Sequence, residues 1–217
     1  MINLPNCTLY TFIDTAYLNG RDPVEVARQL CDGGSDLIQL RAKGSTVDEV
    51  RRLAESILPI TQNNDVGLVI NDHFALASDL GVPLCHLGQE DFFESGNSDV
   101  NQLRGDSTVP QIGISTHSPE QAERAVAAGA DYIAIGPVYS TPTKPSAQPV
   151  TLEYVRWAAA HISRPWFAIG GIHLDNLDEV LEAGARRICV VSAILKSTDI
   201  ALTCQQFKKQ LPSASSE

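Results

Sequence analysis

The chain has 217 residues, of which 43% are hydrophobic, and this is enough apolar content for one sizeable core and a single domain. Its formal net charge of −10 argues against nonspecific binding to nucleic acid, which requires a basic surface. No apolar run is long enough to predict a membrane span, and the first residues do not resemble a secretory signal. The five cysteines are scattered without a CxxC pair, so we expect a reduced, cytoplasmic protein.

Eight short and nearly continuous apolar runs alternate with amphipathic segments along the chain. Continuous apolar runs are typical of parallel strands that are covered on both faces. The intervening segments 23–34, 118–130 and 175–185 have helical spacing, and each has a glycine at or next to its end, which permits a left-handed helix cap. The predicted strands are residues 9–14, 37–41, 67–72, 82–88, 111–115, 132–137, 166–171 and 187–192.

This alternation predicts a single (β/α)8 TIM barrel, an α/β fold with eight parallel strands, over residues 1–211. An open doubly wound sheet is the alternative, but it usually has about five or six strands and a GxGxxG after the first strand, which this chain lacks. Segment 92–110 is rich in Ser, Gly, Asn and Asp, so the fourth helix region should be short. Residues 212–217 are expected to form a disordered tail.

Polar residues cluster where the predicted strands end, which is where barrels of this kind carry their sites. Gln39, Arg41 and Lys43 are spaced by two and therefore share one face of the second strand. Asp72 and Asp91 follow the third and fourth strands, and carboxylate oxygens are the ligands that Mg2+ prefers. Asp72 could alternatively be the N-cap of the next helix.

The later strand ends suggest anion binding. Ser115 ends the fifth predicted strand, while Gly171 and Ser192 lie after the seventh and eighth strands, where barrels often bind phosphate. The segment IGPVYSTPTKPS (135–146) follows the sixth strand, and its prolines restrict its conformations. We therefore predict a lid-like loop over 139–145 whose Lys144 contacts the bound anion. The histidines lack metal-binding spacing, and no Ser/His/Asp elbow motif or reactive cysteine is evident.

Seven motifs in order resemble the thiamine phosphate synthase family: QLRAK (39–43), ND (71–72), HLGQED (86–91), GISTH (113–117), GPVYSTPTK (136–144), AIGGI (168–172) and VVSAI (190–194). The resemblance extends from about Leu9 to Lys196. It implies a transferase of thiamine biosynthesis on a TIM barrel. Such an enzyme joins 4-amino-2-methyl-5-hydroxymethylpyrimidine diphosphate to 4-methyl-5-(2-hydroxyethyl)thiazole phosphate, or its carboxy form, and releases diphosphate by a dissociative route with one Mg2+ per subunit.

The resemblance also implies roles for individual residues. The pyrimidine diphosphate would be bound by Gln39, Arg41, Lys43, Asn71, Ser115 and Lys144. The thiazole phosphate would be bound by Thr141, Pro142, Thr143, Gly171, Val191 and Ser192, and Mg2+ by Asp72 and Asp91. No general acid or base is assigned, and Lys144 and Arg41 would stabilise charge on the leaving group. This sequence departs from the family at Ala42, where Glu is usual, and at His73, where Arg is usual.

Three other functional interpretations are compatible with the same TIM-barrel fold. A thiazole tautomerase-like enzyme should not need both Asp72 and Asp91, and a non-catalytic ligand-binding paralogue should have lost charged site residues, which are all present here. A phosphosugar enzyme would need an acid/base pair at the strand ends, and we identify none. The expected partners are small-molecule substrates, with no nucleic acid and no membrane, and the sequence leaves a homo-oligomer open.

Overall fold

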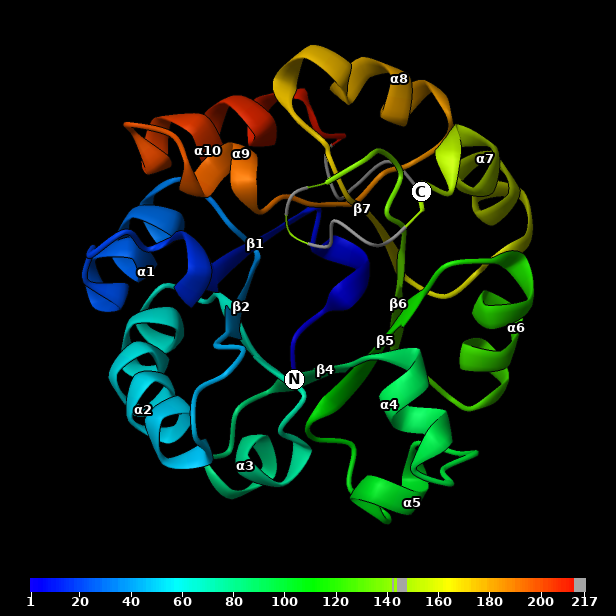
Figure 1. The fold of residues 1–217 in the computed structure, drawn as a ribbon, viewed down its shortest axis with the longest axis horizontal. Helices are drawn as coiled ribbons and strands as arrows, with labels where there is room; N and C mark the ends of the chain where they lie inside the picture. The colour runs from blue at the N-terminus through cyan, green and yellow to red at the C-terminus, as the bar shows by residue number, and fades with distance from the viewer. Residues whose placement is uncertain (142, 144–147, 213–217) are drawn as a thin grey trace.

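The computed structural model describes residues 1–141, 143 and 148–212, and it confirms the predicted TIM barrel. Eight parallel strands pair in sequence order, and β8 closes the barrel by pairing with β1 (Figure 1). The strands are β1 (Leu9–Asp14), β2 (Leu37–Arg41), β3 (Gly67–Asn71), β4 (Leu84–Leu87), β5 (Gln111–Thr116), β6 (Tyr132–Ile135), β7 (Trp166–Ile169) and β8 (Ile188–Cys189). Because all the strands are parallel, their carboxyl ends lie at one end of the barrel.

Helices form a ring outside the strands (Figure 1). They are α1 (Pro23–Asp32), α2 (Val47–Asn63), α3 (Phe74–Asp79), α4 (Gln89–Glu94), α5 (Asn101–Arg104), α6 (Pro119–Ala127), α7 (Thr151–His161), α8 (Leu177–Glu182), α9 (Ser192–Leu195) and α10 (Ile200–Gln210). The described residues also include the short 3-10 turns η1 (Leu4–Asn6), η2 (Thr15–Tyr17) and η3 (Leu174–Asn176). The fourth helix region is short, as predicted, because the polar stretch after β4 forms only α4 and α5.

Side-chain caps determine where several helices begin. The Ser118 hydroxyl accepts a hydrogen bond from Gln121 N at the start of α6, and Pro119 occupies the first turn, as the sequence predicts. Thr46 and Glu49 form a capping box at the start of α2. Each cap begins a helix shortly after a strand end, so the intervening loop is short and holds its polar side chains close to the barrel mouth.

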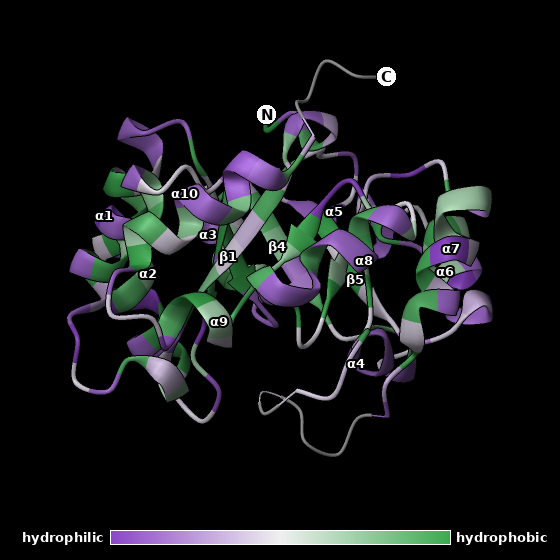
Figure 2. Cartoon of the chain, turned by 90° about the horizontal axis from the view of Figure 1, so that it is seen from above, coloured by the Kyte–Doolittle hydropathy of each residue, from purple (hydrophilic) through white to green (hydrophobic). Residues whose placement is uncertain are grey.

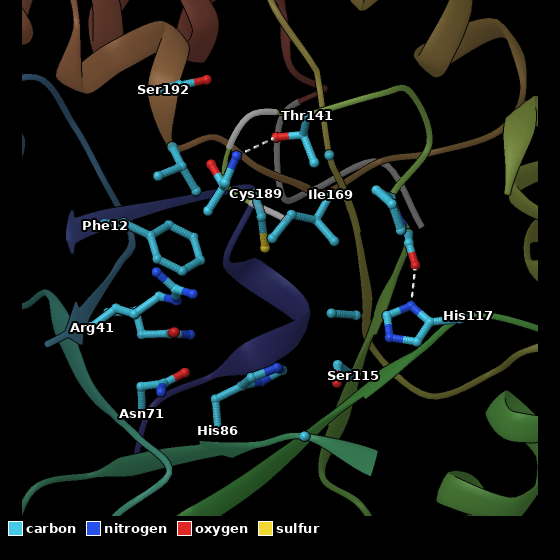
Figure 3. Close-up of a pocket in the computed structure, with 18 of the residues that line it drawn as sticks. Phe12, Arg41, Asn71, His86, Ser115, His117, Thr141, Ile169, Cys189 and Ser192 are labelled. Carbon is cyan, nitrogen blue, oxygen red and sulfur yellow. Dashed lines mark hydrogen bonds between the residues drawn. The ribbon is translucent and has the colours of Figure 1, made fainter. Parts of the chain in front are cut away.

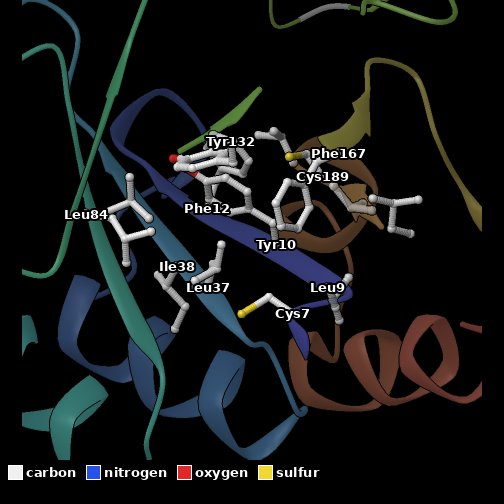
Figure 4. Packing of buried hydrophobic residues seen from close by; sticks show 14 of the residues in the cluster. Cys7, Leu9, Tyr10, Phe12, Leu37, Ile38, Leu84, Tyr132, Phe167 and Cys189 are labelled. Carbon is white, nitrogen blue, oxygen red and sulfur yellow. The ribbon is translucent and has the colours of Figure 1, made fainter. Parts of the chain in front are cut away.

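The interior of the barrel is filled by a layer of aromatic rings. The centroid of the Tyr10 ring lies 5.4 Å from that of Phe167, and the Tyr132 ring lies 5.8 Å from Phe167, both edge to face (Figure 4). A Cβ on Gly113 would lie 2.1 Å from the Tyr132 ring, so only glycine leaves room for that ring in β5. The layer separates the amino end of the barrel from the cavity described below.

A polar network ties together the amino end of the barrel. One carboxylate oxygen of Asp36 accepts hydrogen bonds from Thr8 N at 2.7 Å and from Leu9 N at 2.8 Å, and Lys208 donates to the same oxygen. The network joins the segment before β2 to the start of β1 and to α10, which are far apart in the sequence. The N-terminus lies at this end of the barrel, opposite α4 and α9 (Figure 2).

The hydropathy of the elements follows their position. The strands are predominantly hydrophobic, and the outer faces of helices such as α6 and α8 are hydrophilic (Figure 2). Among the described residues, no helix combines the length and apolar character needed to cross a membrane.

We predict that Asp36→Ala lowers the free energy of unfolding by about 2–4 kcal/mol, because two backbone amides and Lys208 would lose a charged acceptor. Asp36→Asn keeps an acceptor oxygen of similar size, so its loss should be smaller. Urea unfolding followed by circular dichroism measures both. Asp106→Ala, which removes one exposed carboxylate, is the control, and an equal effect of Asp36→Ala and Asp106→Ala would contradict the role of the network.

Candidate active site

A cavity opens at the carboxyl ends of the strands and receives side chains from every part of the barrel (Figure 3). Of the fourteen residues predicted to form a site, Pro142 and Lys144 lie outside the described residues, as does part of the predicted lid. The other twelve all line this cavity: Gln39, Arg41, Lys43, Asn71, Asp72, Asp91, Ser115, Thr141, Thr143, Gly171, Val191 and Ser192. The structure therefore brings residues from seven separate motifs to one place.

Sequence reasoning missed several residues that line the cavity. Phe12, His86, Ile169 and Cys189 come from the ends of β1, β4, β7 and β8, and His117 follows β5. Period-two spacing could have identified two of them, because Phe12 is two residues after the inward-facing Tyr10 and His86 two after Leu84. Ile169 and Cys189 lie in runs so uniformly apolar that the sequence does not distinguish their inward and outward faces, and His117 lies in a polar stretch after β5 that has no strand alternation.

The Arg41 side chain is held in place by a buried carboxylate that the sequence analysis also missed. Arg41 Nη1 lies 2.7 Å from Asp14 Oδ2, and the Asp14 side chain is only 1% exposed. The other carboxylate oxygen of Asp14 accepts a hydrogen bond from Ala16 N at 3.0 Å. Asp14 and Arg41 are paired in the register of β1 and β2, so neighbouring strand ends position both charges. The remaining guanidinium N–H groups can donate into the cavity.

Lys43, Asn71 and Asp72 form a second polar group beside Arg41. The Asp72 Oδ2 atom lies 2.5 Å from Lys43 Nζ and 2.6 Å from Asn71 Nδ2. Asp72 has a left-handed backbone with a φ of 65°, and its N–H donates to the His86 carbonyl. The N-cap of α3 is His73, without a side-chain cap bond, so the structure does not support the alternative role of Asp72 as an N-cap.

Asp91 and Ser115 complete this side of the cavity. Asp91 lies in the first turn of α4, and a Cβ on Gly88 would be 2.7 Å from the Asp91 Oδ2 atom. Glycine at 88 therefore allows the carboxylate to fold back over the end of β4. The Ser115 hydroxyl accepts a hydrogen bond from Gln89 N at 3.4 Å, which links β5 to the same turn.

The carboxylates at the cavity can be compared with the ligands that Mg2+ requires. Within the described part of the chain, no three His, Cys, Asp or Glu side chains gather into a metal-binding group. Asp72 and Asp91 nevertheless line one cavity, and Mg2+ is commonly held by one or two carboxylates together with substrate phosphates and water. The two carboxylates therefore fit a Mg2+ ion that a phosphorylated ligand completes, and they do not fit a site built from protein ligands alone.

Gln39 connects the cavity to the aromatic layer. Its Nε2 atom donates to the Tyr10 hydroxyl at 2.6 Å, and that hydroxyl lies 3.2 Å from the Tyr132 hydroxyl. Desolvation by burial is the main reason why the pKa of Tyr10 and the pKa of Tyr132 are well above the usual tyrosine value. Both phenols therefore stay neutral, and the buried amide of Gln39 has a hydrogen-bond partner, as buried polar groups generally do.

The opposite side of the cavity is built from the loops after β6, β7 and β8. Val138 N donates to Ile169 O and Tyr139 N donates to Gly170 O, so the first two loops are joined. Gly171 has a φ of 65°, and a Cβ there would meet Ser140 O at 2.7 Å. Thr143 Oγ1 lies 3.1 Å from the Tyr17 hydroxyl of η2. Ser192 begins α9, whose first-turn amides have no intrahelical acceptor.

The arrangement offers charge stabilisation at one side and neutral donors at the other. Arg41, Lys43 and the two carboxylates lie on the β2–β4 side, while hydroxyls and backbone amides lie on the β6–β8 side. Burial raises the pKa of Cys189 well above its usual value, so this thiol at the floor is not a nucleophile. The geometry suits a ligand with two anionic groups, or two anionic ligands side by side.

The chain is similar to known proteins over nearly its full length. A family model described as thiamine monophosphate synthase matches residues 9–194. A thiamine-phosphate synthase from Thermus thermophilus is 43% identical over 82% of this chain and 84% of that protein, and one from Acidothermus cellulolyticus is 40% identical over 98% of each. The solved thiamine phosphate pyrophosphorylase from Pyrococcus furiosus superposes with a TM-score of 0.84 at 29% identity, covering 95% of this chain and 96% of that one.

We predict that Asp14→Ala lowers the free energy of unfolding by about 3–5 kcal/mol, because it leaves the largely buried Arg41 guanidinium without its carboxylate. The double variant Asp14→Ala, Arg41→Met should recover part of that loss, since no unpaired charge remains. Thermal unfolding of the single and double variants makes the comparison. A double variant less stable than Asp14→Ala alone would show that the pair does not act as a unit.

Proposed function

Because this chain belongs to the thiamine monophosphate synthase family and is therefore a transferase that forms thiamine phosphate, we propose its substrates and mechanism. The substrates are 4-amino-2-methyl-5-hydroxymethylpyrimidine diphosphate and 4-methyl-5-(2-hydroxyethyl)thiazole phosphate or its carboxy form. Diphosphate is released by a dissociative route, and with the carboxy form the carboxylate must also leave as CO2 to give thiamine phosphate. One observation supports this most strongly: every described residue that the family resemblance assigns to the reaction lines the same cavity.

The diphosphate binds on the β2–β4 side in this proposal. Arg41, fixed by Asp14, and Lys43, paired with Asp72, supply positive charge where the sequence as a whole is acidic. Asn71 donates hydrogen bonds, and Lys144 adds a further cation. Donors that are already positioned stabilise the charge that develops on a leaving diphosphate without reorganising during the reaction. The pyrimidine ring then lies toward Gln39 and Ser115.

The thiazole phosphate binds on the β6–β8 side. The hydroxyls of Thr141, Thr143 and Ser192 and the backbone around Gly171 and Val191 provide the donors. The family resemblance adds Pro142, which lies outside the described residues. Two anions bound at opposite sides of one cavity bring the thiazole nitrogen next to the pyrimidine methylene carbon between them. Holding two reactants in contact can account for a large share of a rate enhancement.

Asp72 and Asp91 are the residues that would hold Mg2+. When bound, Mg2+ would neutralise the diphosphate and make it a better leaving group. The pairing of Asp72 with Lys43 and Asn71 keeps its carboxylate at the mouth of the cavity before substrate arrives. We also propose a cytoplasmic location, because all five cysteines are free thiols.

The direct test is to incubate the purified protein with both precursors and Mg2+ and to detect thiamine phosphate by mass spectrometry. We expect one equivalent of thiamine phosphate for each diphosphate released. A thiazole tautomerase or a ligand-binding paralogue would give no coupled product, so its absence under conditions where the precursors remain intact would overturn the proposal.

The metal prediction is that EDTA abolishes turnover and that added Mg2+ restores it. Asp72→Asn should remain folded, because amide and carboxylate are nearly isosteric, but should lose at least about 100-fold in kcat/KM, in line with the several kcal/mol that a metal supplies. The measurement is initial rate against Mg2+ concentration for both proteins.

Asp79→Asn is the matched control, since it removes the same charge from an exposed carboxylate that pairs with Arg51. Its rate and Mg2+ dependence should equal those of the unaltered protein. Full activity in EDTA, or equal effects of the two substitutions, would remove Asp72 from the metal site.

A further inference from the structure

His117 lies in the cavity, and no role has been assigned to it so far. Its backbone N–H donates to Gln121 Oε1 at 2.7 Å, and its ring Nδ1 is hydrogen-bonded to the Gly136 carbonyl. The residue follows β5, two positions after Ser115, so both side chains line the cavity from the same strand end. Contacts to α6 and to the end of β6 therefore hold both the backbone and the ring of His117.

The bond to Gly136 determines which ring nitrogen carries the proton. A carbonyl oxygen only accepts hydrogen bonds, so Nδ1 must be the donor. In the neutral imidazole, Nε2 then has a lone pair and is an acceptor. Figure 3 shows the ring with Nδ1 directed at the Gly136 oxygen and the other nitrogen on the cavity side. The fold thus presents one oriented acceptor to whatever the cavity binds.

The groups on the two proposed substrates determine what His117 Nε2 can accept a hydrogen bond from. This inference rests on the proposed function. The phosphate and diphosphate groups are acceptors, and the thiazole ring has no N–H. The exocyclic 4-amino group of the pyrimidine is the one N–H donor that the two substrates contain. We propose that His117 Nε2 accepts a hydrogen bond from this 4-amino group and that this bond stabilises the transition state.

The effect on rate follows from where charge develops. As the methylene carbon–oxygen bond breaks, its electron pair leaves with the diphosphate, and positive charge spreads through the ring to the adjacent 4-amino nitrogen. That N–H becomes a stronger donor, so the bond to Nε2 is worth more in the transition state than in the bound substrate. The thiazole nitrogen then donates its lone pair to the carbon, and the positive charge ends on the thiazolium ring without any net proton transfer.

This role requires a neutral imidazole, so the surrounding charges matter. The other charged or titratable side chains that line the cavity are Arg41, Lys43, Asp72, His86 and Asp91, from β2 to α4, and Cys189 from β8, whose pKa is raised by burial so that the thiol stays neutral. Among the described residues, the walls formed by β6, β7 and their loops contribute no charged side chain. A protonated His117 could instead donate to the diphosphate, and this alternative has the opposite pH dependence.

Two substitutions separate the two ring nitrogens. His117→Asn places an amide N–H near the position of Nδ1, so it can keep the bond to Gly136 but has no acceptor at Nε2. His117→Gln reaches the position of Nε2 and can accept there, but loses the bond to Gly136. We expect His117→Asn to lower kcat about 10- to 100-fold near pH 8, the loss typical of one hydrogen bond to a charged group. The KM for thiazole phosphate should change less than about threefold, and His117→Gln should retain more activity than His117→Asn.

The reverse order, with His117→Asn close to wild type and His117→Gln impaired, would overturn the proposal and leave the Gly136 bond as the only role. The second readout is the ratio of wild-type to His117→Asn kcat across pH, in which titrations of substrate and other residues cancel. We expect the ratio to be largest at high pH and to fall toward one as the pH is lowered, because a protonated imidazole has no lone pair at Nε2. A ratio that rises at low pH would overturn the proposal in favour of donation to the diphosphate.

Thermal unfolding midpoints of both variants check that the fold is intact. Failure of this inference is distinguishable from failure of the proposed function. A wild-type protein that forms no thiamine phosphate would refute the function, whereas an active wild type with an equally active His117→Asn would refute only the role of Nε2.

Discussion

The aromatic layer across the barrel is the constraint on which the rest of the structure depends. Tyr10, Tyr132 and Phe167 meet edge to face in the interior, where the absence of a side chain at Gly113 admits one of the rings. Below them lies the amino end of the barrel with its polar network around Asp36, and above them the cavity begins. The Tyr10 hydroxyl holds a cavity residue through the amide of Gln39, and the rings of Phe12 and His86 lie against Tyr10 and Tyr132. The layer thereby fixes the depth of the cavity and prevents a ligand from sinking into the core.

The cations above the aromatic layer explain how a protein with an acidic net charge can hold anions. Among the described residues, the cavity cations Arg41 and Lys43 are each paired with a carboxylate, but the two pairs differ. The Arg41 side chain is 16% exposed and its partner Asp14 is buried, so Arg41 is fixed and only its remaining N–H groups face outward. The Lys43 side chain is 55% exposed. Because an ion pair exposed to solvent to this degree contributes little stability, Lys43 can exchange Asp72 for a phosphate oxygen. Arg41 is therefore a fixed part of the cavity wall, whereas the Lys43 side chain can move to contact the ligand.

Much of the barrel and of the candidate site could be predicted from the sequence. Buried parallel strands have continuous apolar runs, and the first polar residues after each run mark the end of the strand. That signal located Gln39, Asp72 and Ser115 correctly at the cavity. It could not reveal Asp14, since a polar residue ending the first strand gives no sign of a partner 27 positions later in the register. The predicted eighth strand, 187–192, is regular only at Ile188–Cys189, because the chain turns at once into α9. Contacts between strand ends depend on register, which local patterns do not encode.

The proposed dissociative route would also limit which side chains the floor of the cavity can contain. A cation formed on the pyrimidine methylene carbon would react with any strong nucleophile nearby, and the cavity floor holds a cysteine. Burial in the aromatic and aliphatic core raises the pKa of Cys189, so its sulfur stays a protonated, weakly nucleophilic thiol. Phe12 and Ile169 beside it offer no lone pairs at all. In the proposed route, the packing that closes the barrel would therefore also protect the cation, because it would leave the thiazole nitrogen as the nucleophile best placed to reach it.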